Sequence, residues 1–251
     1  MGLALGLILS AVIGLSLGLV GGGGSIITVP ILVYALGIPP HQAIGMSLAV
    51  VGATALIGAM LHHRRGSVSW KTGSVFAASG ILSAYLGSKL TRLVSPPILM
   101  LFFAGIMLVA AILMLARRHP ETEKPHVPSP PREALAGFGV GFMTGFLGVG
   151  GGFLIVPALH VFGGLPMKAA IGTSLFVIAI NCAAGLIGHM TSGAVDWKMT
   201  ALVTGLAVTG ALAGTALSDR FHPKGLRGLF AWLVLAVAAY LIYRNYNALF
   251  Q

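Results

Sequence analysis

The chain has 251 residues, of which 57% are hydrophobic and only 8% are charged, and its formal net charge is +10. A soluble domain has about 25% charged residues, so this chain lacks the polar side chains to cover a large core in water. The composition predicts an integral membrane protein. It argues against a nucleic-acid-binding protein, because the Lys and Arg residues lie in short connections between apolar runs.

Eight apolar stretches follow one another along the chain. They cover roughly residues 3–36, 42–61, 70–90, 97–116, 134–163, 169–191, 198–218 and 225–243. Six of them are close to the roughly 20 residues that a helix needs to cross a bilayer. The first stretch of each half is longer, and a glycine cluster interrupts it. The sequence therefore predicts an all-α membrane protein.

A proline-rich, charged segment divides the chain near its midpoint. Residues 117–133 form this predicted linker, because prolines stop a helix from continuing and the charges require water. The segment separates a first membrane repeat (1–116) from a second (134–248). Residues 249–251, Leu-Phe-Gln, match the remnant of a 3C-type protease tag and are left out of the functional argument.

The two halves repeat at a constant offset of 127 residues. Chance similarity between apolar segments would not keep histidine, tryptophan, lysine and proline in one register. The matched pairs include Gly21/Gly148, Gly24/Gly151, Pro30/Pro157, Gly45/Gly172, Ser47/Ser174, His62/His189, Trp70/Trp197 and Lys71/Lys198.

Two topologies are compatible with this repeat. If every stretch crosses once, the repeats are parallel and the Lys and Arg residues divide nine to six between the two sides. If the first stretch of each half enters, breaks at its glycines and returns, three full crossings follow and the repeats are inverted. The division is then eleven to four. The positive-inside rule favours the inverted arrangement, with both termini outside.

The glycine clusters are the main candidate site. A run of glycines is a poor helix former, and non-helical backbone at membrane depth persists only inside protein or beside water. Short apolar runs follow, Ile26–Leu36 and Phe153–Gly163, and each predicts a half-crossing helix whose N-terminus attracts anions. Close helix packing is the alternative explanation. The candidate substrate-binding residues of the clusters are Gly21, Gly22, Gly23, Gly24, Ser25, Gly148, Gly150, Gly151 and Gly152.

Polar side chains in the following stretch of each half complete the candidate set. Ser47 and Ser174 occupy matched positions in Ala-Ile-Gly-x-Ser-Leu segments, and Thr173 stands beside Ser174. Their hydroxyls are candidate donors to an oxyanion, or they bond to their own helix. Asn181 is either a contact between helices or part of the site.

His62 and His189 end the same stretches and are candidates for gating or proton handling. The alternative is a structural role near the membrane boundary, next to Trp70 and Trp197, which are typical interfacial anchors.

The lack of carboxylates within the apolar stretches and of paired cysteines argues against several other functions. The acids are Glu121, Glu123, Glu133, Asp196 and Asp219, all in connections or at segment ends. Carboxylates inside the membrane carry protons and bind cations in many pumps and exchangers, so a cation transporter or a carboxylate-driven proton antiporter is disfavoured. One cysteine, Cys182, excludes a disulfide framework. No Ser/His/Asp arrangement or ligand cluster indicates an enzyme, a metal or a cofactor.

Three motifs resemble the sulfite exporter TauE/SafE family. They are G-x-x-x-G-x-x-G-x-G-G-G-x-x-x-x-P at 141–157, A-I-G-T-S-L at 170–175 and G-x-x-x-H-x-x-x-G-x-V-x-W at 185–197. The resemblance implies about eight helical segments and transport of sulfite or organosulfonates such as sulfoacetate, mostly outward, across the cytoplasmic membrane. The first half departs from the pattern at Ser25 and Met46, which argues against a fully symmetric site.

We therefore expect a multi-pass protein of the inner membrane that exports a small sulfur-containing anion through a site between the repeats. A passive anion channel, or a transporter of another carboxylate or oxyanion, is the alternative. The expected partners are the anion and the lipid bilayer. The oligomeric state is open, with a homodimer as one option.

Overall fold

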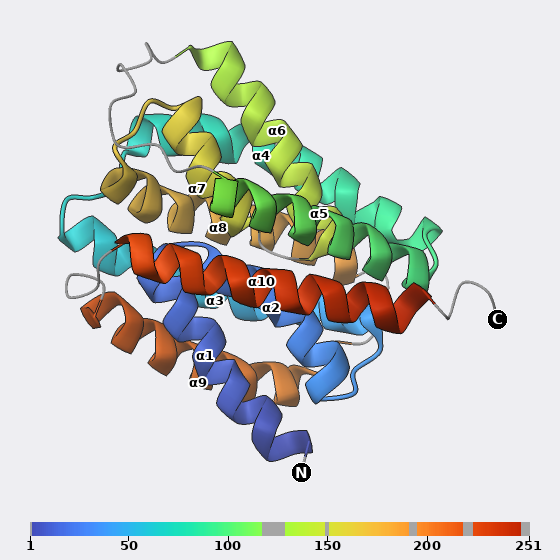
Figure 1. Cartoon of the computed structure of the whole chain (residues 1–251). Helices are drawn as coiled ribbons and strands as arrows, with labels where there is room; N and C mark the ends of the chain where they lie inside the picture. The colour runs from blue at the N-terminus through green and yellow to red at the C-terminus, as the bar shows by residue number, and fades with distance from the viewer. Residues whose placement is uncertain (1, 117–128, 149–150, 191–194, 218–222, 247–251) are drawn as a thin grey trace.

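The computed structural model describes residues 2–116, 129–148, 151–190, 195–217 and 223–246, and within these ranges it contains helices and no strand (Figure 1). The all-α prediction is confirmed. The helices are α1 (Gly2–Val20), α2 (Gly23–Pro30), the π-helix η1 (Ile31–Ala35), α3 (Pro40–Arg64), α4 (Trp70–Leu90), the 3-10 helix η2 (Thr91–Leu93), α5 (Pro96–Ala116), α6 (Pro130–Leu147), α7 (Gly152–Val161), α8 (Met167–Met190), α9 (Trp197–Leu217) and α10 (Pro223–Tyr246).

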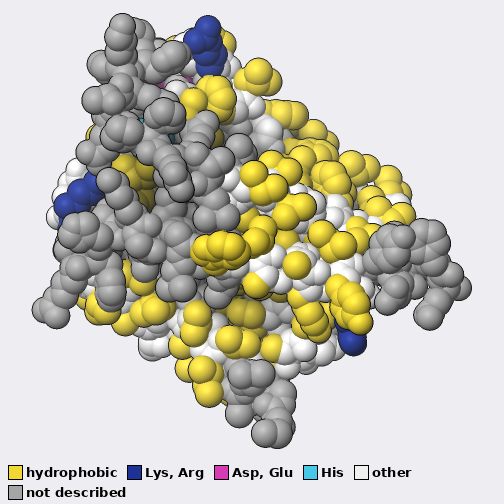
Figure 2. All heavy atoms as spheres, in the orientation of Figure 1, with side chains coloured by type: hydrophobic (Ala, Val, Ile, Leu, Met, Phe, Trp, Pro, Cys, Tyr) yellow, Lys and Arg dark blue, Asp and Glu magenta, His cyan; other side chains and the backbone are white. Residues whose placement is uncertain are grey.

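Three of these helices, α3, α8 and α9, are long and apolar enough to cross a membrane. Shorter apolar segments lie at 6–19, 23–35, 96–109 and 234–244. Helix α4 has 21 residues but does not reach the same apolar content, because serine, glycine and lysine interrupt it. Hydrophobic side chains cover most of the described part of the face in Figure 2, with Lys and Arg at its margins. This surface is that of a protein whose solvent is lipid.

Both glycine clusters break the first stretch of their half, as predicted. Helix α1 ends at Val20, and Gly21 adopts a left-handed φ of +75°; helix α6 ends at Leu147, and Gly148 has a φ of +67°. Glycine adopts this conformation without steric cost. We call residues 21–22 the first break. The second break lies between the end of α6 at Leu147 and the start of α7 at Gly152, and of its residues the structure describes Gly148 and Gly151.

The breaks are shorter than the sequence indicated. The predicted half-helices began at Ile26 and Phe153, whereas α2 begins at Gly23 and α7 at Gly152. Gly24 is helical because its backbone packs directly on α1, where a Cβ would overlap the carbonyl oxygen of Ile13. Tertiary packing thus overrides the low helix propensity of glycine here.

Glycines also set the closest contacts between helices. A Cβ at Gly14 of α1 would overlap the carbonyl oxygen of Ala207 of α9, and a Cβ at Gly145 of α6 would overlap that of Ala84 of α4. In lipid, helices associate through close backbone approach rather than through the hydrophobic effect. The packing interpretation therefore holds for these isolated glycines.

Helices α3 and α8 pack side by side in opposite directions. A Cβ at Gly58 would lie 3.0 Å from the side chain of Leu175, and one at Gly45 would lie 3.8 Å from the Cβ of His189. In Figure 1, α5 and α10 also run in opposite directions. Parallel repeats would align each of these corresponding pairs in the same direction, so the contacts favour the inverted arrangement. The repeat itself stays a prediction from sequence.

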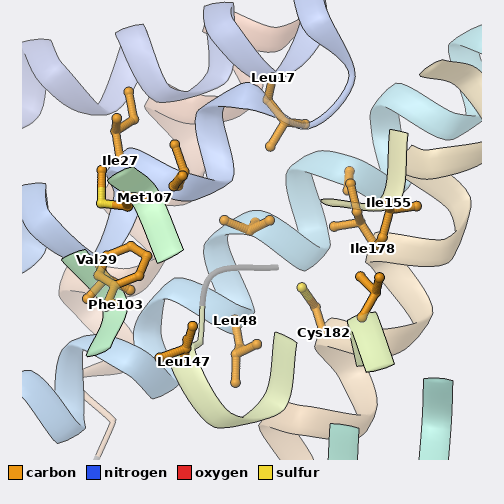
Figure 3. Close-up of a cluster of buried hydrophobic side chains, with 14 of the residues drawn as sticks. Leu17, Ile27, Val29, Leu48, Phe103, Met107, Leu147, Ile155, Ile178 and Cys182 are labelled. Atoms are coloured by element: carbon orange, nitrogen blue, oxygen red, sulfur yellow. The ribbon is translucent and has the colours of Figure 1, made fainter. Parts of the chain in front are cut away.

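The buried core joins both halves. Figure 3 shows Leu17 of α1, Ile27 of α2 and Leu48 of α3 in one cluster with Ile178 of α8. All four side chains are at most 4% exposed. The described glycines of the two breaks, Gly21, Gly22, Gly148 and Gly151, are also buried. Burial in protein is the condition under which irregular backbone is stable at membrane depth.

The close packing of α1 on α9 predicts a difference between two glycine substitutions. Gly14→Ala places a methyl group against the backbone of Ala207, and overpacking of this kind costs about 1–3 kcal/mol. Gly205→Ala, on the same α9, meets nothing within 4 Å. Thermal unfolding of the purified variants in detergent should show a lower Tm for Gly14→Ala only. Equal Tm values would contradict the described packing.

Candidate functional site

The N-termini of the two half-helices meet at the centre of the site. A Cβ at Gly22 would overlap the backbone of Gly152, and a Cβ at Gly152 would overlap that of Gly22. The N-caps of α2 and α7 are Gly22 and Gly151, which have no side chain to accept the first N–H groups of the helices. Two positive helix ends therefore point into one buried region.

Each break is covered by the start of a long helix from the other half. Gly21 packs on Ile171 of α8, and Gly148 packs on Ile44 of α3. The hydroxyl of Ser174 shares its one proton between the carbonyl oxygen of Ile171 in its own helix, at 2.7 Å, and that of Gly21, at 3.0 Å. The two Ala-Ile-Gly-x-Ser segments thus lie at the breaks, as the functional interpretation of the motifs requires.

The two histidines lie on the far side of the same segments. His62 packs against Gly172 and His189 against Gly45, and each side chain is only 5% exposed. Nδ1 of His62 is 3.0 Å from Oγ of Ser67. Nδ1 of His189 is 3.2 Å from the carbonyl oxygen of Gly185, so it is the donor in that contact. Both histidines are part of the buried packing between the halves.

Thr173 has a structural contact in this arrangement. Its Oγ1 accepts a hydrogen bond from the backbone N–H of Ser69, at 2.9 Å, and so ties the segment before α4 to α8. Sequence reasoning assigned this hydroxyl to the substrate. The structure gives its oxygen a partner within the protein.

Ser47 and Asn181 have no such contact. Ser47 is fully buried, Asn181 is 1% exposed, and within the described ranges neither the hydroxyl nor either amide atom has a hydrogen-bond partner. The amide of Asn181 lies against Gly80 of α4. Asn181 is seven residues from Ser174, roughly 10 Å along α8 at 1.5 Å per residue. It therefore lies further along α8 than Ile171 and Ser174, the residues that contact Gly21.

Some of the residues predicted to bind the substrate have other contacts, and others lie outside the residues that the structure describes. Gly24 packs on α1, and Ser25 donates its hydroxyl to the carbonyl oxygen of Gly22, at 2.7 Å. Gly23 is buried in the first turn of α2. Gly150, the linker residues 117–128 and the tag remnant 249–251 lie outside the described residues.

The two acidic groups that the structure describes lie at the starts of α6 and α9. Asp196 is exposed before α9, and Glu133 is buried in the first turn of α6, beside the linker. Burial raises the pKa of the Glu133 carboxyl, and the charge of Lys71 opposes that shift. Among the described residues no group of three His, Cys, Asp or Glu side chains could hold a metal ion.

Sequence reasoning missed the contacts that cross between the halves. It grouped the glycine clusters and the hydroxyl motifs of both halves into one candidate set, and it did not say which cluster lies beside which motif. In the structure Gly21 packs on Ile171 of the second half, and Gly148 packs on Ile44 of the first. It also gave Gly80 no role, although Gly80 faces Asn181. The offset of 127 aligns equivalent residues but carries no information about which residues touch.

Two opposed half-helices with meeting N-termini, enclosed by longer apolar helices, define a membrane transporter. The chain belongs to the sulfite exporter TauE/SafE family, whose model matches residues 6–241.

The relatives carry names of the same class. A probable membrane transporter protein of Xylella fastidiosa (strain 9a5c) is 35% identical over 244 residues, which is 94% of each chain. The probable membrane transporter protein YdhB of Bacillus subtilis is 29% identical, covering 92% of this chain and 96% of its own. MJ0441 of Methanocaldococcus jannaschii, also named a probable membrane transporter protein, is 25% identical over 94% of each chain. No solved structure matches the chain.

The contact between Gly45 and His189 predicts a crosslink between the halves. The 3.8 Å separation of the two Cβ positions equals the mean of about 3.8 Å in disulfides. Gly45→Cys with His189→Cys, in a Cys182→Ala background, should therefore form a disulfide on mild oxidation, detected by mass spectrometry of the digested protein. Gly45→Cys with Met190→Cys is the control, because Met190 is 56% exposed. Equal crosslinking of both pairs would contradict the described register of α3 and α8.

Proposed function

We propose that the protein is a transporter that moves sulfite or a small organosulfonate, such as sulfoacetate, outward across the inner membrane. The observation that carries this proposal is the meeting of the α2 and α7 N-termini at Gly22 and Gly152. The family description supports the substrate class.

The chemistry of the breaks suits an anion rather than a cation. Each helix N-terminus acts as roughly half a positive charge, and its first N–H groups are hydrogen-bond donors. A sulfonate or sulfite offers three oxygens as acceptors, so several backbone N–H groups bind it at once. The acids that the structure describes, Glu133 and Asp196, lie at helix starts away from the breaks. An anion would therefore meet attraction without a repelling carboxylate.

Neither α2 nor α7 contains a lysine or an arginine, and this affects how tightly a substrate anion would be held. Transport requires binding strong enough for the substrate to enter and weak enough for it to leave. Backbone dipoles and neutral hydroxyl or amide donors stabilise an anion less than a buried guanidinium would. A site of this kind favours turnover over retention.

The substrate prediction is tested by ligand-induced stabilisation of the purified protein. Sulfite, sulfoacetate, taurine, sulfate, acetate and chloride are compared at concentrations up to tens of millimolar. A ligand at a hundred times its Kd stabilises the folded state by about 2.7 kcal/mol, so we expect a raised Tm with sulfite or sulfoacetate. Taurine, whose ammonium group offsets its charge, and chloride should have smaller effects. A raised Tm with acetate alone would indicate that the substrate is a carboxylate and not a sulfur oxyanion.

Counterflow in proteoliposomes separates a transporter from a passive channel. Vesicles loaded with unlabelled substrate should accumulate labelled substrate transiently, because a transporter exchanges one molecule for another. Simple equilibration at a rate that does not saturate would indicate a channel. Gly24 is unsuitable as a probe in this assay, because any side chain there collides with α1.

A further inference from the structure

An exposed lysine continues the face of α8 that covers the first break. Ile171 packs on Gly21, and the hydroxyl of Ser174 donates to the carbonyl oxygen of Gly21. Lys168 lies three residues before Ile171, and residues three apart on a helix share a face. Gly21 is buried, whereas Lys168 is exposed. Lys168 therefore lies one helical turn from the contact with Gly21, where α8 begins.

An exposed arginine reaches the other side of the same break. Arg65 follows the last residue of α3, and its Nη1 donates to the carbonyl oxygen of Thr215 in α9, at 3.2 Å. Thr215 packs on α1, where a Cβ at Gly18 would lie 3.0 Å from its Oγ1. Gly18 is one helical turn before Gly21. Arg65 is therefore held close to the first break from the side of α1 and α9, and Lys168 from the side of α8.

The surrounding charges are of the same sign. The end of α3 and the start of α8 lie together because these helices run in opposite directions, and α6 begins beside the start of α4, where Gly137 packs on Phe76. We call this the basic end of the bundle. The acid that the structure describes there, Glu133, is only 4% exposed. The exposed Lys and Arg side chains described there are Arg64, Arg65, Lys71, Arg132 and Lys168.

The residue that the offset of 127 matches with Lys168 has a different role. It is His41, three residues before Ile44, which packs on Gly148. Nε2 of His41 is 3.3 Å from the carbonyl oxygen of Thr91, so the ring is the donor in a contact within the protein. Histidine is also only partly charged near pH 7. The second half therefore has a full positive charge at a position where the first half has a weaker cation.

The second cation has no charged counterpart at all. The same offset matches Arg65 with Ser192, which lies outside the described residues and is uncharged. Two positive charges are thus present beside the first break, at one end of the bundle, and their sequence counterparts do not reproduce them. A fixed difference of this kind distinguishes the two directions of transport.

We infer that Lys168 and Arg65 form the entry for the substrate anion, and that the anion reaches the first break from the basic end. The positive-inside rule assigns the basic end to the cytoplasm. Exposed cations raise the local concentration of an anion without holding it tightly. Lys168 and Arg65 are therefore positioning residues, which act before the anion is bound. This inference rests on the proposed function and adds to it the side and the residues of entry.

The test is uptake of labelled sulfoacetate into inside-out membrane vesicles, which measures entry from the cytoplasmic side. Sulfoacetate carries two negative charges, so Lys168→Gln and Arg65→Gln should each raise its KM about threefold at low salt, and the double variant about tenfold. The maximal rate should stay unchanged, because the buried site is intact. At a salt concentration of about 1 M the Debye length is about 3 Å, and the differences in KM should disappear.

Charge-matched variants are the controls. Lys198→Gln removes an exposed cation at the start of α9, at the opposite end of the bundle, and should leave the KM for cytoplasmic entry unchanged. Lys168→Arg and Arg65→Lys keep the charge and should have the wild-type KM. A wild-type KM in the double variant at low salt would overturn the inference. A lower maximal rate and Tm that Arg65→Lys does not restore would also overturn it, since the contact with Thr215 would then be structural.

A lipid arm separates the substrate from anionic headgroups, which the same cations would attract. The increase in KM should persist after reconstitution into phosphatidylcholine alone. An increase that required phosphatidylglycerol would show that Lys168 and Arg65 bind lipid, and would overturn the inference while leaving the transport function intact. Failure of the wild type to take up either sulfoacetate or sulfite would overturn the proposed function, on which the inference rests.

Discussion

The backbone contact between Gly22 and Gly152 is the constraint on which the other features depend. Two helix N-termini repel each other electrostatically, because both present partial positive charge. They are held together here by long helices from opposite halves, with Ile171 packed on Gly21 and Ile44 on Gly148. The repulsion is relieved when an anion lies between or beside the two ends.

This arrangement depends on residues that lack side chains. Helices α1 and α9, and likewise α4 and α6, approach until backbone meets backbone at Gly14 and Gly145. In lipid this close approach replaces the hydrophobic effect as the source of association. Because steric contact fixes these pairs, it also fixes the ends of α1 and α6, after which Gly21 and Gly148 begin the breaks. The same small residues that assemble the bundle therefore set the geometry of the site.

The sequence was sufficient for the class of protein, the apolar helices and the two breaks, because these depend on composition and on local backbone preference. It was not sufficient for the ends of the breaks, since Gly24 is helical only through its contact with α1. It also left Ser47 and Ser174 equivalent. The structure distinguishes them, because the hydroxyl of Ser174 has carbonyl acceptors in Ile171 and Gly21, whereas that of Ser47 has no acceptor among the described residues. Such differences arise from contacts between distant segments, which one sequence does not reveal.

The pairing of α1 with α9 has a consequence for biosynthesis. Helix α1 leaves the ribosome well before α9, on which it packs, and α4 likewise leaves before α6. Contacts between such distant segments form late. Until then the glycine faces of α1 and α4 stay exposed to lipid or to other helices, so the first half of the chain is a unit of sequence but not of folding. An insertion machinery that retained the early helices until α9 emerged would shorten the time in which they pair wrongly.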